Sequence, residues 1–104
     1  MGYSWVERKE LAIKQVQISS DARRDLRKVP VYIADKLLSW IGRVEKVGVE
    51  EVRKFKGYHD EPLRGDRKGQ RSLRLSKSYR AIYEIKNNNS IEFISIEEVN
   101  KHDY

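Results

Sequence analysis

Apolar residues recur with a helical period in the middle of the chain. The stripe follows Pro30 and comprises Ile33, Leu37, Leu38, Ile41, Val44 and Val47. This spacing is typical of one amphipathic helix, and a proline suits the first turn of such a helix better than its interior. Gly48 is a natural place for the helix to end. Trp40 is expected to widen its apolar face.

Shorter elements lie on either side of this helix. Residues 11–18 are rich in β-branched side chains and end at two serines, which predicts a strand. Ser20 or Asp21 then offers an N-cap for a helix over residues 22–28. Beyond Gly48, residues 49–55 predict a short helical turn.

The second half of the chain has the pattern of a β-sheet. Residues 56–69 are polar and rich in turn-forming residues, so they predict a long loop. Alternating apolar and polar side chains then predict three strands, with a hairpin connection between the last two; the strands are 70–75, 79–85 and 91–99, and the connection is 87–90. The order β-α-α-β-β-β predicts an α+β fold, in which a helical hairpin packs on a small, twisted, mainly antiparallel sheet.

Length and composition limit the class of protein. The 104 residues predict a single domain over 1–104, in which residues 1–10 form an extension of unknown role. No run of about 18 apolar residues is present, and the start lacks the apolar region of a signal peptide, so we expect a cytoplasmic protein without a membrane partner. The chain has no cysteine and only two histidines. Neither a disulfide framework nor a zinc site is therefore expected, and no cofactor is implied.

The positive charge is concentrated in one segment. The chain has a net charge of +6, from 22 Lys and Arg against 16 Asp and Glu. Residues 53–80 hold ten basic and three acidic residues, a net of +7, whereas residues 81–104 carry a net of −3. A basic segment on a near-neutral remainder indicates a polyanionic partner. The plainer alternative is a solvated face that serves solubility.

Candidate chemistry lies in this basic segment and at the C-terminus. The segment has no Gly-rich phosphate-binding motif, and no Ser-His-Asp arrangement stands out. Glu61 falls in the polar loop, Arg74 and Arg80 fall on neighbouring predicted strands, and His102 and Tyr104 end the chain. Cleavage of RNA without a metal needs a base for the 2′-hydroxyl, cations for the phosphorane and an acid for the leaving oxygen. A carboxylate, arginines and a histidine provide these groups.

The motifs of residues 57–104 resemble the RelE/ParE superfamily of toxins from type II toxin–antitoxin systems. The resemblance rests on the run HDEPLRGDRKGQRSLRL at 59–75, the run YRAIY at 79–83, and the tail with His and Tyr. It is strongest to the YoeB and HigB branches, and it covers nearly the whole chain after residue 10. The resemblance implies the β-α-α-β-β-β order and a ribosome-dependent mRNA endonuclease. It also implies a cognate antitoxin as partner, with operator DNA reached only through that antitoxin.

The resemblance also assigns roles to individual residues. Glu61 falls on the general base, Arg80 on the arginine that stabilises the transition state, His102 on the general acid, and Tyr104 on the aromatic that orients the substrate. The residues expected to bind RNA phosphates are Arg64, Arg67, Lys68, Arg71, Arg74 and Lys101. Two departures leave alternatives open. Asp103 separates His102 from Tyr104 and is an alternative acid, and His59 is an alternative base.

Other interpretations of the same residues remain open. In the simplest account, none of the three residues has a catalytic role. Glu61 then only balances neighbouring arginines, Arg80 forms a structural ion pair with a strand neighbour such as Glu92, and His102 has no function. At the level of the whole protein, one alternative is a ParE-like, non-catalytic inhibitor of DNA gyrase. Such a toxin needs neither the Glu-Pro-Leu loop nor the terminal His and Tyr. The other alternative is a plain nucleic-acid-binding domain that leaves mRNA uncut.

Overall fold

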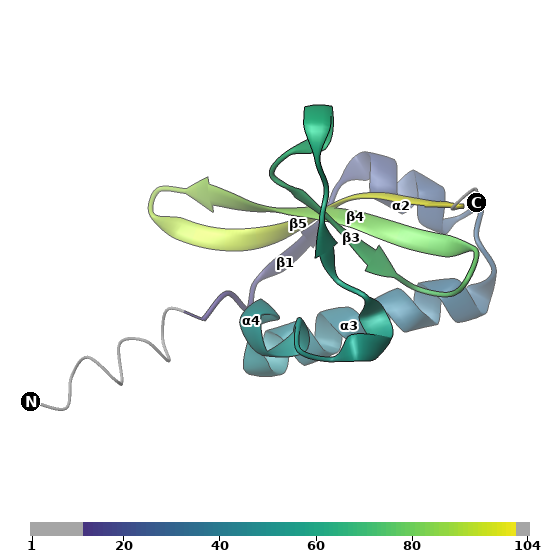
Figure 1. Ribbon diagram of the computed structural model, residues 1–104, viewed down its shortest axis with the longest axis horizontal. Helices are drawn as coiled ribbons and strands as arrows, with labels where there is room; N and C mark the ends of the chain where they lie inside the picture. The colour runs from purple at the N-terminus through teal and green to yellow at the C-terminus, as the bar shows by residue number, and fades with distance from the viewer. Residues whose placement is uncertain (1–11, 102–104) are drawn as a thin grey trace, which may run out of the picture.

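The computed structural model describes residues 12–101 and consists of three helices and a five-stranded sheet (Figure 1). The helices are α2 (Ser20–Leu26), α3 (Val31–Val47) and α4 (Val49–Val52). The strands are β1 (Val16–Ile18), β2 (Glu61–Pro62), β3 (Gln70–Arg74), β4 (Tyr79–Asn88) and β5 (Ile91–Lys101). Two 3₁₀ turns, η1 (Lys56–Tyr58) and η2 (Gly65–Arg67), flank β2. The expected α+β fold is confirmed.

The strands lie in the order β1-β5-β4-β3-β2. β1 is parallel to β5, and the other neighbours are antiparallel. Three of the predicted extents were wrong. The hairpin connection predicted at 87–90 is only Asn89 and Ser90, because β4 runs on to Asn88, which pairs with Ile91. The first strand has three residues instead of the eight of 11–18, and the stretch 56–69 is not one loop, because β2 within it adds an edge strand beside β3.

The helices begin and end close to the predicted positions. α2 starts at Ser20 because the Ser19 hydroxyl accepts a hydrogen bond from the Ala22 amide, so the N-cap is Ser19 and neither of the predicted residues, Ser20 and Asp21. α3 ends at Val47, and Gly48 follows with a φ of 92°, a conformation that favours glycine. The predicted apolar face of α3 needs two corrections, because Val47, at the end of the helix, and Leu38 are both exposed. Trp40 is fully buried, whereas Leu38 is 55% exposed.

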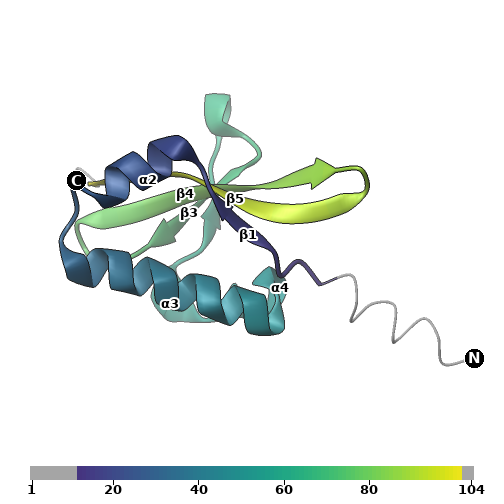
Figure 2. The same ribbon diagram turned by 180° about the vertical axis from the view of Figure 1, so that it is seen from behind.

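The two faces of the sheet differ. One face packs on α3 and α4 and forms the core, where the Trp40 and Tyr83 rings lie 5.1 Å apart (Figures 1 and 2). The connection between β2 and β3, with η2 at its tip, projects on the other side of the sheet. Side chains alternate along a strand, so Arg80 and Ile82 point away from the face on which Ala81 and Tyr83 join the core. That second face carries the candidate site.

The β4–β5 hairpin is longer than its neighbours and projects beyond them (Figure 1). A two-residue connection, Asn89 and Ser90, joins the strands, and both residues have positive φ, 52° and 70°. This pattern is typical of a type I′ hairpin turn. Among residues 12–101, no helix has the length and apolar character that crossing a bilayer requires.

Candidate functional site

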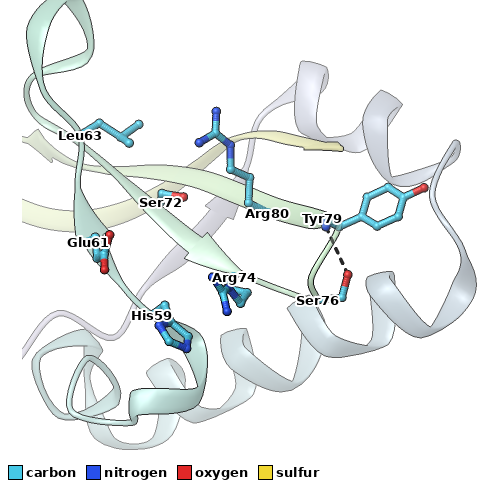
Figure 3. A pocket seen from close by; sticks show the side chains of 8 residues that line it. All are labelled: His59, Glu61, Leu63, Ser72, Arg74, Ser76, Tyr79 and Arg80. Carbon is cyan, nitrogen blue, oxygen red and sulfur yellow. Dashed lines mark hydrogen bonds between the residues drawn. The ribbon is translucent and has the colours of Figure 1, made fainter. Parts of the chain in front are cut away.

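A hollow of about 190 Å³ lies on the second face of the sheet (Figure 3). It is lined by His59, Glu61, Leu63, Ser72, Arg74, Ser76, Tyr79 and Arg80. These residues come from the segment before β2, from β2, β3 and β4, and from the short connections between them. Three residues predicted to act in catalysis or RNA binding, Glu61, Arg74 and Arg80, are thus brought together with the alternative base His59.

Strand register explains why these charged side chains share a face. Arg74 pairs directly with Arg80 across β3 and β4, and Glu61 pairs with Ser72, two residues before Arg74. Paired residues of antiparallel strands point to the same side, as do residues two apart on one strand. A carboxylate on an edge strand therefore faces the same hollow as two guanidinium groups. Figure 3 shows the Tyr79 ring pointing away from His59 and Glu61.

The structural alternative proposed for Arg80 is wrong in its partner. Arg80 pairs with Asn100 on β5, and its Nε donates a hydrogen bond to the Asn100 side-chain oxygen at 3.4 Å. Glu92 lies near the hairpin tip, where it pairs with Asn87. The contact with a neutral amide leaves the charge of Arg80 uncompensated by that neighbour.

The predicted acid and its neighbours, His102, Asp103 and Tyr104, lie outside the described residues. Lys101, the last described residue, is exposed and pairs with Tyr79, which lines the hollow. The described part of the chain therefore places the predicted base, Glu61, and the predicted transition-state arginine, Arg80, at one hollow. The role of His102 as the acid stays a prediction.

A buried network beside the hollow was missed in the sequence analysis. The Asp60 side chain is only 1% exposed, and one of its oxygens lies 2.6 Å from Arg71 Nε. Its other oxygen accepts a hydrogen bond from the Tyr83 hydroxyl at 2.5 Å, and Arg53 Nε donates to that hydroxyl at 3.3 Å. The only sequence signal for this network was an acid next to the expected catalytic Glu61.

The network changes the chemistry of its members. Burial, together with the charge and the hydrogen bond of Asp60, raises the pKa of the Tyr83 hydroxyl far above its usual value, and Arg53 opposes this only in part. Burial acts to lower the pKa of Arg71, but the hydrogen bond and the charge of Asp60 outweigh it, so that pKa is raised. Tyr83 is therefore a neutral hydrogen-bond donor, and Arg71 is a fixed cation.

His59 adopts an unusual backbone conformation at the edge of the hollow. Its φ of 45° and ψ of 50° lie in the left-handed region, which costs a non-glycine residue on the order of 1–2 kcal/mol. The residue directly follows η1 and directly precedes the buried Asp60. Strain of this kind persists only where the surrounding structure fixes it.

The residues predicted to bind RNA divide into two groups. Asp60 holds Arg71, and Glu98 holds Arg67, at 2.8 Å between side-chain atoms in the second pair. The hydrogen bond and the charge of Glu98 raise the pKa of Arg67. Arg64, Lys68, Arg74 and Lys101 have exposed side chains. Because Arg71 is only 23% exposed and already bound, direct phosphate contact is a poorer assignment for it than for the exposed group.

The part of the chain from residue 12 to 101 contains no group of three or more His, Asp or Glu side chains placed to hold a metal ion.

Comparison with known proteins identifies the family. The model of the ParE toxin of type II toxin–antitoxin systems matches residues 16–99. The fold is similar to the RelBE2 toxin–antitoxin complex of Mycobacterium tuberculosis, with 25% identity, a TM-score of 0.60, and coverage of 85% of this chain and 96% of that one. A comparison with curated proteins gave no match.

Two further solved structures share the fold at lower identity. The archaeal RelE–RelB complex of Pyrococcus horikoshii is 22% identical, with a TM-score of 0.60 and coverage of 84% of this chain and 92% of that one. YafQ of Escherichia coli is 16% identical, with a TM-score of 0.66 and coverage of 85% and 92%. Because the family model spans most of the sequence, the chain belongs to the ParE toxin family and is a toxin of a type II toxin–antitoxin system.

Proposed function

We propose that this toxin is a metal-independent, ribosome-dependent mRNA endoribonuclease that inhibits translation. The observation that supports the proposal is the hollow that Glu61, His59, Arg74 and Arg80 line together. A hollow lined by a carboxylate and two arginines is suited to a phosphodiester, because arginine binds phosphate oxygens in a planar fork. In a nuclease, the carboxylate adds a proton acceptor to the cations that bind the phosphate.

In this mechanism Glu61 is the general base. It takes the proton of the 2′-hydroxyl, the 2′-oxygen attacks phosphorus, and the bond to the 5′-oxygen breaks. Arg80 stabilises the charge of the phosphorane, and His102 gives its proton to the leaving 5′-oxygen. The products are a 2′,3′-cyclic phosphate and a free 5′-hydroxyl. His59 remains the alternative base, Asp103 the alternative acid, and Tyr104 orients the nucleotide.

The exposed basic residues around the hollow bind the backbone of the substrate. We assign this role to Arg64, Lys68, Arg74 and Lys101. A domain of this size has few groups that read bases, so the ribosome is needed to position the mRNA. Ribosome and mRNA as partners place the toxin in the cytoplasm.

A cognate antitoxin is the proposed inhibitor. The similar structures from M. tuberculosis and P. horikoshii are complexes with a partner of this kind. For this chain we propose an antitoxin that binds the toxin tightly, and contact with operator DNA only through that antitoxin.

Cleavage on ribosomes tests the proposal. Purified toxin is added to a translating extract, and primer extension maps new 5′ ends on a reporter mRNA. We expect cuts within the translated frame and none on the same RNA without ribosomes. Equal cutting of naked and translated RNA would contradict ribosome dependence, and the absence of any cut would contradict the nuclease.

The acid is tested by substitution. His102→Gln is expected to abolish cleavage on the ribosome, whereas His59→Gln leaves the larger part of it. The reverse result would move the essential imidazole to His59.

Inhibition of DNA gyrase is the second candidate, and the match to the ParE family model favours it. A gyrase inhibitor would block supercoiling of plasmid DNA and leave mRNA intact. In that case Glu61→Gln and Arg80→Ala would leave the block unchanged, because the hollow would have no chemical role. The two assays on the same preparation therefore separate the candidates.

A further inference from the structure

We propose that Asp60 is a positioning residue, a buried anchor that holds His59 and Glu61 against the Arg74–Arg80 pair. The proposal rests on the proposed nuclease function for its effect on the reaction, whereas the anchoring itself is independent of that function. Asp60 does not line the hollow. It acts through its two neighbours in sequence.

Asp60 contacts two strands directly and a third part of the chain through Tyr83. Arg71 is on β3, Tyr83 is on β4, and Arg53, which donates to the Tyr83 hydroxyl, directly follows α4. Arg71 also donates a second hydrogen bond, from its Nη2 to the Asp60 backbone oxygen at 3.3 Å. Both carboxylate oxygens and the main chain of this one residue are thus fixed to the sheet.

The inward direction of Asp60 determines where its neighbours point. Successive side chains of an extended segment alternate between faces, so an Asp60 that points into the protein turns Glu61 outward to the hollow. His59 is held in its left-handed conformation between the last bond of η1, His59 N to Lys56 O at 3.1 Å, and this anchor. Beyond β2, the amide of Leu63 donates to Gln70 O at 2.9 Å.

A purely structural ion pair is the competing explanation. Buried ion pairs contribute little net stability compared with apolar residues, because removing both charges from water is costly. The location favours the positioning role, since Asp60 lies between Glu61, the proposed base, and His59, its alternative. The two explanations differ in what the loss of the Asp60 contacts would change. Loss of a structural pair would lower the stability of the whole fold, whereas loss of a positioning residue would loosen the segment 59–63 and slow the reaction.

Asp60→Asn tests the proposal, with Asp66→Asn as the matched control. Asp66 is an exposed carboxylate in the same basic segment, in η2. Amide hydrogen exchange of His59 and Leu63 is compared with that of core amides in α3. Because hydrogen bonds to a buried charge carry a large part of local stability, we expect about tenfold to hundredfold faster exchange at His59 and Leu63 in Asp60→Asn. The α3 amides of that variant and all amides of Asp66→Asn are expected to exchange as in the wild type.

The chemical effect is measured in the same variants. The chain has two histidines, so the imidazole NMR signals that remain in His102→Gln belong to His59. These signals are expected to move in Asp60→Asn and to stay in Asp66→Asn. The single-turnover rate of mRNA cleavage is expected to fall about tenfold or more in Asp60→Asn, with ribosome affinity unchanged, as for a loss of alignment.

Tyr83→Phe provides a graded variant in case Asp60→Asn fails to fold. It removes one hydrogen bond to Asp60 and keeps the ion pair with Arg71, so exchange at Leu63 and the cleavage rate are expected to change in the same direction by a smaller factor.

Unchanged exchange and unchanged His59 signals in both variants would overturn the anchoring. Faster local exchange with a wild-type cleavage rate would overturn the positioning role. A wild-type protein that cuts no mRNA would overturn the proposed function instead, while the exchange data and the His59 signals still decide the anchoring.

Discussion

Asp60 and Glu61 are adjacent acids with opposite environments. The Asp60 carboxylate is buried with two partners, whereas Glu61 is exposed at the hollow. The amino-acid sequence indicated Glu61 through its resemblance to known toxins, and it gave no reason to separate Asp60 from other loop acids. The difference depends on β2 pairing with β3, and that pairing is a tertiary contact with no local pattern.

Arg80→Ala is expected to abolish cleavage and to leave the fold intact. Removing one group that stabilises transition-state charge costs about a hundredfold to a thousandfold in rate. The hydrogen bond to Asn100 at 3.4 Å is a small loss to stability, about 1 kcal/mol or less. Cleavage is measured by primer extension and the free energy of unfolding by urea denaturation. Arg24→Ala, at an exposed arginine on α2, is the control and is expected to cut at the wild-type rate. An Arg80→Ala protein that is unfolded would make Arg80 a structural residue.

Tyr83 gives the fold a dependence on alkaline pH. Because its pKa is raised, the folded protein holds the hydroxyl proton more tightly than the unfolded chain does. This contribution is fully present below pH ~10, the usual tyrosine pKa, and is lost as the pH rises from there toward the folded pKa. The difference in free energy of unfolding between wild type and Tyr83→Phe is therefore expected to narrow above that pH. The same difference for Tyr32→Phe, at an exposed tyrosine on α3, is the control. A difference in free energy of unfolding between wild type and Tyr83→Phe that stays constant as the pH rises would contradict this contribution of Tyr83.

The longer elements were predictable from local pattern, and the short ones were not. α3 and the β4–β5 hairpin have enough residues for a period to be visible. β1 and β2 have three and two residues, and each exists because a longer strand offers a free edge beside it. Leu38 was wrongly placed in the core because apolar character alone does not distinguish it from Trp40, which contacts Tyr83.

The hairpin turn is not optimal in its second residue. Ser90 has a φ of 70°, a conformation that favours glycine, and the Asn-Gly pair is the preferred type I′ turn. Ser90→Gly is expected to raise the free energy of unfolding by about 0.5–1 kcal/mol. The Ser90 amide still donates to the Asn87 side chain, because that bond is made by the backbone. Urea denaturation measures the effect. Ser78→Gly, at a turn residue without positive φ, is the control and is expected to bring no gain. An equal gain in both variants would contradict the turn explanation.

At the scale of the whole molecule, acids from outside the basic segment 53–80 lie against its bases and reduce its local charge. Of the ten bases in residues 53–80, Lys54, Arg67 and Arg71 form ion pairs with acids of the protein. Two of those acids, Glu51 and Glu98, lie outside the segment, so counting them reduces its net charge from +7 to +5. The Arg67–Glu98 pair joins η2 to β5 and is not visible in the order of residues, whereas Lys54 and Glu51 are only three residues apart. The segment therefore keeps a net positive charge.

Association with the proposed antitoxin is expected to depend on this segment. If an acidic antitoxin segment approaches the exposed bases, long-range attraction raises the association rate more than it changes the dissociation rate. The double variant Lys56→Glu with Lys77→Glu changes two exposed bases of the segment, and Arg27→Glu with Lys28→Glu makes the same change in charge after α2. Stopped-flow measurement at low ionic strength is expected to show a fall of about tenfold in the association rate for the first pair and a much smaller fall for the second. High salt is expected to remove the difference, because it screens exposed charges. Equal falls in the association rate for both pairs would mean that only the net charge of the toxin matters. An association rate that is insensitive to salt would instead indicate docking on the exposed apolar side chains of α3, where Val31, Tyr32 and Leu38 face solvent.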